Sequence, residues 1–219
     1  RGETDELSRG LATALTAVQT CRGTQFDLEA RLESARGQRD RARAEVMSIE
    51  ALQRAALGQA DTRANEWLRT SGLGDRPRLA EALQVDAGYE RAVETVLGDY
   101  LEAVCVEGLD AISASLEGLA GTHLAIFESG GSNGAAAAAG TLAAHVRGPQ
   151  AVLDLLARVR VGDSLAAALT ARRSLGAAES LITRDGEWIG HGWLRVARGG
   201  DAHAGVLERE QRLKALRAE

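Results

Sequence analysis

Lysine is almost absent from this chain, since Lys214 is its single lysine and the other basic residues are arginine. A phosphate-binding P-loop needs a lysine directly after its glycines. Lys214 instead follows Leu213 within a stretch of helix-forming residues. The sequence therefore contains no Walker A motif, and we expect neither ATP nor Mg²⁺ to bind this chain.

Cysteine is also scarce: Cys21 and Cys105 are far apart, and no CxxC pair occurs. Structural zinc sites need four convergent ligands, which this spacing does not supply. We expect both cysteines to act as small buried apolar residues, which fits a reducing cytoplasm. A cysteine inside an apolar strand, as predicted for Cys105, is usually inert.

The four histidines, His123, His145, His191 and His203, are scattered, and no pair has the i,i+4 spacing of a helical metal site. No pair of carboxylates suggests general acid and base chemistry. The sequence therefore predicts neither a metal centre nor a catalytic site, and we expect this chain not to be an enzyme.

Long apolar runs are missing as well. No run approaches the ~20 residues that span a bilayer, and the N-terminus does not resemble a signal peptide. We therefore expect a cytoplasmic protein without a membrane partner. The net charge is −5 and no long segment is globally basic, so any contact with DNA would have to be a local patch.

The first fifty residues carry a heptad pattern, which is typical of a coiled coil. Eleven of its thirteen seam positions are apolar. The seam consists of Leu7, Leu11, Ala14, Val18, Cys21, Gln25, Leu28, Leu32, Ala35, Arg39, Ala42, Val46 and Ile49. Because a lone helix would expose this stripe to water, the pattern predicts a partner helix.

A partner is available at the other end of the chain. Residues 206–219 are good helix formers with Val206, Leu213 and Leu216 at roughly heptad spacing. We predict that the two helices pair antiparallel. The predicted organisation is an outgoing coiled-coil arm (1–52), a globular domain (53–204) and a returning arm (205–219).

The globular part has the pattern of a mixed α/β domain. A short apolar strand at 102–107 is followed by a helix and a second strand at 123–128, which favours a parallel βαβ unit. Near its end, Asp185-Gly186 predicts a hairpin with a type I′ turn, and residues 193–196 predict a further strand. The fold class is therefore α/β, inserted at the end of an antiparallel coiled coil.

Two blocks carry a family resemblance: GYERAVETVLGDYLEAVCVE at residues 88–107, and LITRDGEWIGHGWLRVARGG at residues 181–200, followed by a charged helix. Together they resemble the hinge domain of bacterial SMC (structural maintenance of chromosomes) proteins. The resemblance implies a homodimer of two hinges and a ring that entraps DNA. It also implies ATPase heads with ATP and Mg²⁺, kleisin-type accessory subunits bound outside this chain, and a place in the nucleoid.

The resemblance also implies two sets of site residues. Glycines near the end of the hinge let backbones approach at the dimer contact, and the matching positions are Gly192, Gly199 and Gly200. Basic residues near the coil junction bind DNA in this family. The matching positions are Arg195, Arg198, Arg209, Arg212 and Lys214. For the basic set a second interpretation is open, a solvated coil surface that pairs Glu with Arg at i,i+4 spacing.

Three functions remain open from the sequence. The first is homodimerisation, in which edge strands or glycine-rich turns of two subunits meet. The second is a DNA-binding or generic coiled-coil oligomerisation module without ring closure. The third, a small-molecule α/β enzyme, would need a deep pocket with convergent polar groups, and no motif supports it.

Overall fold

The computed structural model describes residues 2–57, 62–110, 112, 116, 119, 123–130, 138–196 and 203–218. The chain divides into two compact units, Arg1–Ser48 and Ile49–Glu219. The α-helices are α1 Gly2–Ala56, α2 Thr62–Thr70, α3 Leu79–Ala82, α4 Glu90–Leu97, α5 Gln150–Leu156, α6 Leu165–Ala171 and α7 Val206–Ala218. The 3₁₀ helices are η1 Gly98–Glu102, η3 Leu142–His145 and η4 Arg172–Ser174. The strands are β1 Gln84–Val85, β2 Val104–Val106, β3 Ile126–Glu128, β4 Val146–Arg147, β5 Val159–Gly162, β6 Ser180–Thr183, β7 Glu187–Ile189 and β8 Leu194–Val196.

The first unit is built from α1, which runs without a break through Gly10, Gly23 and Gly37. Apolar seam residues such as Leu11 and Leu28 are exposed. Cys21 is exposed too, so the expectation that it is buried is wrong. The physical reason is length: the returning helix has 13 residues against 55 in α1.

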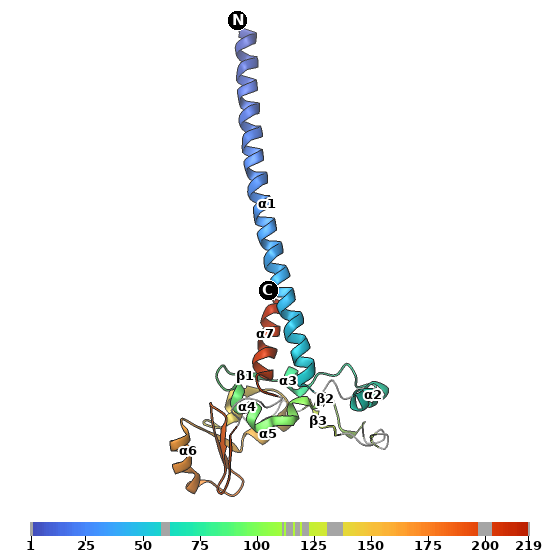
Figure 1. The fold of residues 1–219 in the computed structure, drawn as a ribbon, viewed down its shortest axis with the longest axis vertical. Helices are drawn as coiled ribbons and strands as arrows, with labels where there is room; N and C mark the ends of the chain where they lie inside the picture. Colours follow the sequence, from blue (N-terminus) through green and yellow to red (C-terminus); the bar gives the residue numbers. More distant parts are fainter. Residues whose placement is uncertain are drawn as a thin grey trace. The chain divides into compact units, whose positions relative to one another are not determined.

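Within the second unit, the last turns of α1 lie beside α7 and run antiparallel to it (Figure 1). Near the C-terminal end of α7, Arg217 donates to Glu50 at 2.8 Å. Near its N-terminal end, the Gln53 amide donates to the carbonyl oxygen of Val206 at 3.0 Å. Leu57 follows in the buried core. The predicted antiparallel coiled coil is therefore confirmed at its root.

In the part of the second unit that the structure describes, the strands form three small sheets. β2 and β3 are parallel, as the βαβ prediction requires, and β1 pairs antiparallel with β4. The largest sheet has the order β5-β6-β7-β8, with β5 and β6 parallel and the remaining pairs antiparallel. About half of the residues between β2 and β3 lie outside the described residues. The mixed α/β fold class is confirmed.

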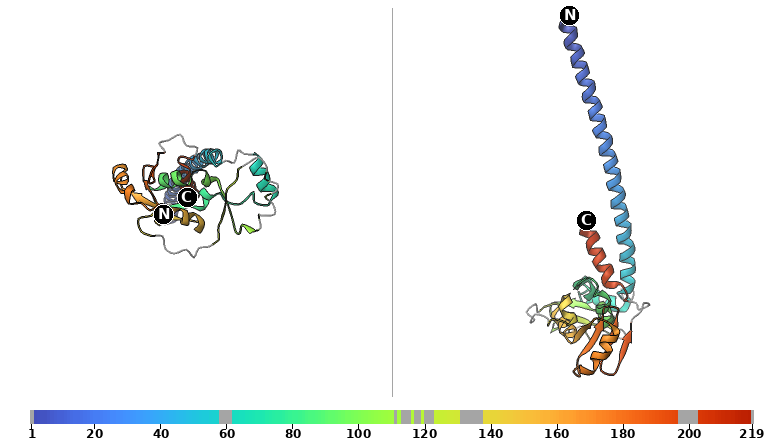
Figure 2. Two further views of the ribbon diagram at one scale, coloured as in Figure 1. Left: turned by 90° about the horizontal axis from the view of Figure 1, so that it is seen from below. Right: turned by 90° about the vertical axis from the view of Figure 1, so that its left-hand side faces the viewer.

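The four-stranded sheet is covered on both faces. On one face, Leu181 and Ile189 pack with Ala168 of α6, and α6 is the orange helix beside the strands of this sheet in Figure 2. On the other face, Ile182 joins the main core, with Trp188 packed against it. This alternation follows from the two-residue period of a strand. Strands β6 and β7 are therefore held from both sides.

The hairpin between β6 and β7 forms where the sequence predicts it, but its turn type differs. Gly186 has φ of 84°, while no other residue type in the described ranges has a positive φ. A type I′ turn needs a positive φ at both central residues, so that part of the prediction is wrong. The Gly186 N–H donates to the carbonyl oxygen of Thr183 at 3.1 Å, which fits a three-residue loop with a glycine bulge.

Candidate functional site

The end strand β8 is the candidate site. It pairs with β7 in the register Trp188 opposite Arg195 and Ile189 opposite Leu194. It is the last strand of its sheet, so one row of its backbone N–H and C=O groups faces away from the sheet. Such an edge is a template for another strand, and natural proteins usually protect it with charge, proline or a covering element.

Apart from Arg195, the side chains from Trp193 to Val196 are apolar and exposed. Trp193, Leu194 and Val196 are 46%, 49% and 42% exposed. Leu194 continues the row of Leu181 and Ile189, which are buried beside α6. The apolar surface of that row therefore continues into solvent at β8. Within the described residues no further strand pairs with β8, and an unpaired edge with exposed apolar side chains is typical of a surface that accepts a second chain.

A glycine positions the tryptophan at this edge, and it is not one of the predicted glycines. A Cβ atom placed on Gly190 would overlap the indole ring of Trp193, whereas one placed on Gly192 would meet nothing within 4 Å. Trp193 also makes an edge-to-face contact with Trp188, with ring centroids 5.0 Å apart. Sequence reasoning missed Gly190 and Trp193, because a Gly-x-x-Trp spacing alone does not show where the ring folds back.

The strand β3 ends the parallel β2-β3 pair and offers a second edge. Ile126 and Phe127 are half-buried, and Glu128 is exposed. Tyr100 is 49% exposed and meets Phe127 edge to face at 5.6 Å. The described part of the domain therefore has two three-residue edge strands, β3 and β8, with aromatic side chains beside them.

The predicted glycine and arginine positions fall partly at this site. Gly192 lies in the bend between β7 and β8, and Arg195 lies on β8. Both are exposed. The predicted residues Arg198, Gly199 and Gly200 lie outside the described residues.

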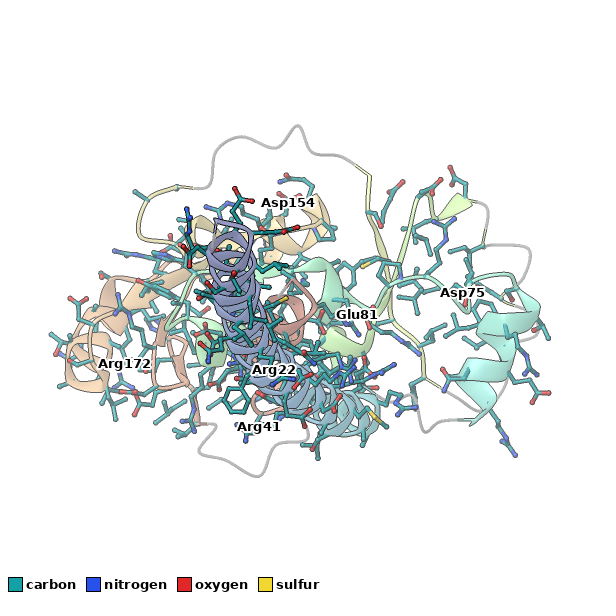
Figure 3. All side chains as sticks on the ribbon, turned by 90° about the horizontal axis from the view of Figure 1, so that it is seen from above. Arg22, Arg41, Asp75, Glu81, Asp154 and Arg172 are labelled. Carbon is teal, nitrogen blue, oxygen red and sulfur yellow. The ribbon has the colours of Figure 1, made fainter. Side chains whose placement is uncertain are left out.

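The predicted basic residues of α7 do not form one exposed group. Lys214 donates to the carbonyl oxygens of Glu81 and Leu83, at 2.8 and 3.4 Å, and Glu81 lies on α3 next to α7 (Figure 3). Arg209 is half-buried and donates to Gln53 and to the carbonyl oxygen of Ala204. Arg212 is exposed. Lys214 and Arg209 are therefore engaged in holding the root of α7.

A cavity of about 570 Å³ lies at this root. Its lining consists of Glu50, Gln53, Arg54, Leu57, Glu81, Glu210, Leu213, Lys214 and Arg217. Its charges largely pair with each other, as in Arg217 with Glu50 at 2.8 Å and Lys214 with Glu210 at 3.9 Å. Burial raises the pKa of Glu210, which is 6% exposed. Because its charged groups pair with each other, we interpret this cavity as a gap in the packing between α1, α3 and α7 and not as a binding site.

Chemically reactive groups are few in the ranges that the structure describes. Burial raises the pKa of Cys105 to about 11, so its thiol is protonated at neutral pH and a poor nucleophile. Within those ranges, no three His, Cys, Asp or Glu side chains are grouped so that they could hold a metal ion. No described helix is long and apolar enough to cross a membrane.

Comparison with known proteins gives consistent results. The profile described as "SMC proteins Flexible Hinge Domain" matches residues 72–172. The chain is 40% identical over 153 residues to the "Chromosome partition protein Smc" of Xanthomonas oryzae, which is 70% of this chain and 13% of that protein. It is 38% identical over 173 residues to the protein of the same name from Coxiella burnetii, covering 78% of this chain and 15% of that protein.

The fold has a counterpart among solved structures. A structure described as an asymmetric dimer of the Geobacillus stearothermophilus SMC hinge domain matches with a TM-score of 0.65 and 21% identity. The match covers 87% of this chain and 85% of that one. This likeness supports the fold. The chain spans only a small part of the length of the curated relatives that it matches.

Proposed function

The chain belongs to the SMC hinge family, and on that premise we propose that its α/β part joins two copies of a chromosome partition protein through the β8 edge. The observation that carries this proposal is the combination at β8 of an open strand edge with exposed Trp193, Leu194 and Val196. The related Geobacillus hinge is described as a dimer, which supports self-association here.

The two edge strands β8 and β3 allow two arrangements of the dimer, which differ in how many of these edges become paired. If β8 of one copy pairs with β3 of the other, a two-fold axis repeats the contact and closes both edges of both copies. If β8 pairs with β8, the β3 edges stay open. We propose the first arrangement, because it covers more backbone groups and also covers the exposed ring of Tyr100 beside β3.

The test is the absolute mass of the whole chain by light scattering across a dilution series. Val196→Asp places a charge on the proposed contact, and we expect a folded monomer. The matched control is Leu155→Asp on α5, a residue that is similarly exposed at 45% and should leave the dimer intact. A Val196→Asp variant that stays dimeric would overturn the β8 proposal.

Cysteine cross-linking distinguishes the two arrangements. In a Cys21→Ser background, Val196→Cys combined with Glu128→Cys should form a disulfide between copies if β8 meets β3. Val196→Cys alone should cross-link only if β8 meets β8. The paired change Gly199→Asp and Gly200→Asp tests the glycine contact that the resemblance implies, and a folded monomer is expected there too.

DNA binding near the coil junction is a second proposed function. Both Arg195 and Arg212 are exposed. We expect the double change Arg195→Ala and Arg212→Ala to weaken binding to DNA and to reduce its salt dependence. The control is Arg76→Ala, which removes an arginine away from this junction. If both variants bind DNA with equal affinity, the coil junction is not the DNA-binding site.

The role of the whole protein follows from its relatives and reaches beyond this chain. Proteins named for chromosome partition resemble it, so we propose that the hinge helps to close a ring around DNA in the nucleoid. ATP, Mg²⁺ and kleisin-type subunits would bind outside this chain. Light scattering and DNA binding by the chain itself test the hinge part of this proposal.

A further inference from the structure

The N-terminus of α7 is capped from outside its own sequence. The first turn of a helix leaves backbone N–H groups without a partner, and a Ser, Thr, Asp or Asn before the helix usually accepts from one of them. Here Gly205 stands before Val206 and has no side chain. The carboxylate of Glu94, on α4, takes this place: it accepts from Gly205 N at 3.0 Å and from Leu207 N at 2.9 Å.

Glu94 is buried, at 9% exposure, which makes this contact unusual for a carboxylate. Burial raises the pKa of Glu94, while the two backbone N–H groups and Arg209 act in the opposite direction. Both carboxylate oxygens are therefore occupied by donors from the start of the returning arm. A negative charge at a helix N-terminus is also favoured by the helix dipole.

Other polar contacts tie the same face of α7 and the turn before it to the domain. Nε2 of His203 lies 3.2 Å from Asp99 and 3.4 Å from Glu102. Further along, the Gln211 amide donates to the Val85 carbonyl oxygen at 2.8 Å, and Lys214 donates to the end of α3. The outgoing helix is held differently, because the bonds of Glu50 and Gln53 in its last turns run to α7.

We propose that Glu94 is a positioning residue that fixes the direction in which the returning arm leaves the domain. Hydrogen bonds from the α/β domain fix α7, and hydrogen bonds from α7 in turn fix the end of α1. This inference does not depend on dimerisation, because Glu94 contacts α7 and not the β8 edge. It predicts that loss of the Glu94 contact frees the root of the returning arm while the domain stays folded.

The decisive variant is Glu94→Gln, which keeps size and shape. A glutamine has one acceptor oxygen, so its NH₂ group would face one of the two backbone N–H donors. The matched control is Glu90→Gln, one turn earlier on α4, whose carboxylate accepts from Gly88 N at 2.7 Å. Glu94→Asp keeps the charge and serves as the second variant if Glu94→Gln does not fold.

The measurement is amide hydrogen exchange by NMR on the full chain. In Glu94→Gln we expect the amides of Gly205 and Leu207 to exchange about tenfold faster or more, because a hydrogen bond to a charged group is lost. The amides of β2 and β6 should not change. Glu90→Gln should match the unchanged protein at all of these positions.

A distance measurement gives a second readout that a simple loss of stability would not change. Spin labels at Ala157 and Ala215, both exposed, report the position of α7 on the domain. In a Cys21→Ser background, Glu94→Gln should broaden the distance distribution and Glu90→Gln should not. Unchanged exchange at Gly205 and Leu207, or equal acceleration at all amides, would overturn the proposal. If the Glu94→Gln protein still has the mass of a dimer, the β8 proposal stands whether or not the Glu94 proposal does.

Discussion

Gly190 and Gly192 are two residues apart, but replacing them with alanine should affect stability differently. Gly190→Ala should lower the free energy of unfolding, whereas Gly192→Ala should leave it almost unchanged. A Cβ on Gly190 would overlap the Trp193 indole, which cannot bend out of the way as a flexible chain could. Trp193 must therefore leave its place and give up its edge-to-face contact with Trp188. A Cβ on Gly192 meets nothing, and Gly192 does not have a positive φ.

The magnitude follows from the surface that Trp193 covers. A fully buried aromatic side chain hides roughly 150–250 Å², and Trp193 is 46% exposed, so it hides about half of that. At about 25 cal/mol per Å² this area corresponds to ~2–3 kcal/mol, and part of it is recovered when the ring packs elsewhere. The edge-to-face contact adds ~0.5–1.5 kcal/mol. We therefore expect Gly190→Ala to lower the free energy of unfolding by about 1–3 kcal/mol.

The assay is urea unfolding followed by tryptophan fluorescence, at several protein concentrations so that association is separated from folding. Gly192→Ala should change the free energy of unfolding by less than ~0.5 kcal/mol. If Gly192 lies at the subunit contact, this variant should still weaken the dimer. A Gly190→Ala protein with unchanged stability and unchanged fluorescence would show that the Gly190–Trp193 contact does not form.

Three further outcomes are expected. Burial raises the pKa of Glu210 above its usual value of 4.5. Between the unfolded and the native pKa, the native protein holds a proton that the unfolded chain has lost, so the free energy of unfolding falls as the pH rises through that window. Glu210→Gln should remove this loss, so its urea midpoint should rise relative to that of the unchanged protein as the pH rises above 4.5. A difference between the two midpoints that is independent of pH would contradict this. Iodoacetamide should modify Cys21, which is exposed, and should reach the buried Cys105 only after urea unfolding, as mass spectrometry of the native and unfolded protein will show. Lys214→Met keeps the apolar stem but loses the bond to the Glu81 carbonyl oxygen, so thermal unfolding should show a loss of about 0.5–1.5 kcal/mol, and an unchanged melting temperature would mean that this bond contributes nothing.

The local elements of this protein follow from its sequence. Heptad spacing predicts α1 and α7 and their antiparallel pairing, which the bond between Glu50 and Arg217 confirms at the root. Short apolar runs predict β2 and β3, and Gly186 marks the hairpin. These signals are readable because helix and strand periods act within a few residues.

The proposed contact edge, β8, could be identified only from the tertiary structure. Nothing in the run Trp193 to Val196 says that it ends a sheet, because strand order depends on which distant segments pair. For the same reason the spacing of Gly190 and Gly192 does not show which of them lies under an indole ring. Residues 197–202 lie outside the described ranges, so Gly199 and Gly200 stay predictions.

The roles of charged residues were also decided in three dimensions. Lys214 reads as a DNA-binding residue in the sequence, yet its amine bonds the end of α3, 131 to 133 residues away along the chain. Glu94 is buried and caps a helix that begins more than a hundred residues further along the chain, as its bond to Gly205 N, 111 residues away, shows. The sequence determines which segments form helices and strands, because those preferences are local, although the strands predicted at 102–107 and 123–128 are shorter in the structure. The partner of each charge, and the strand edge that remains open, depend on contacts between distant segments, which exist only once the chain has folded.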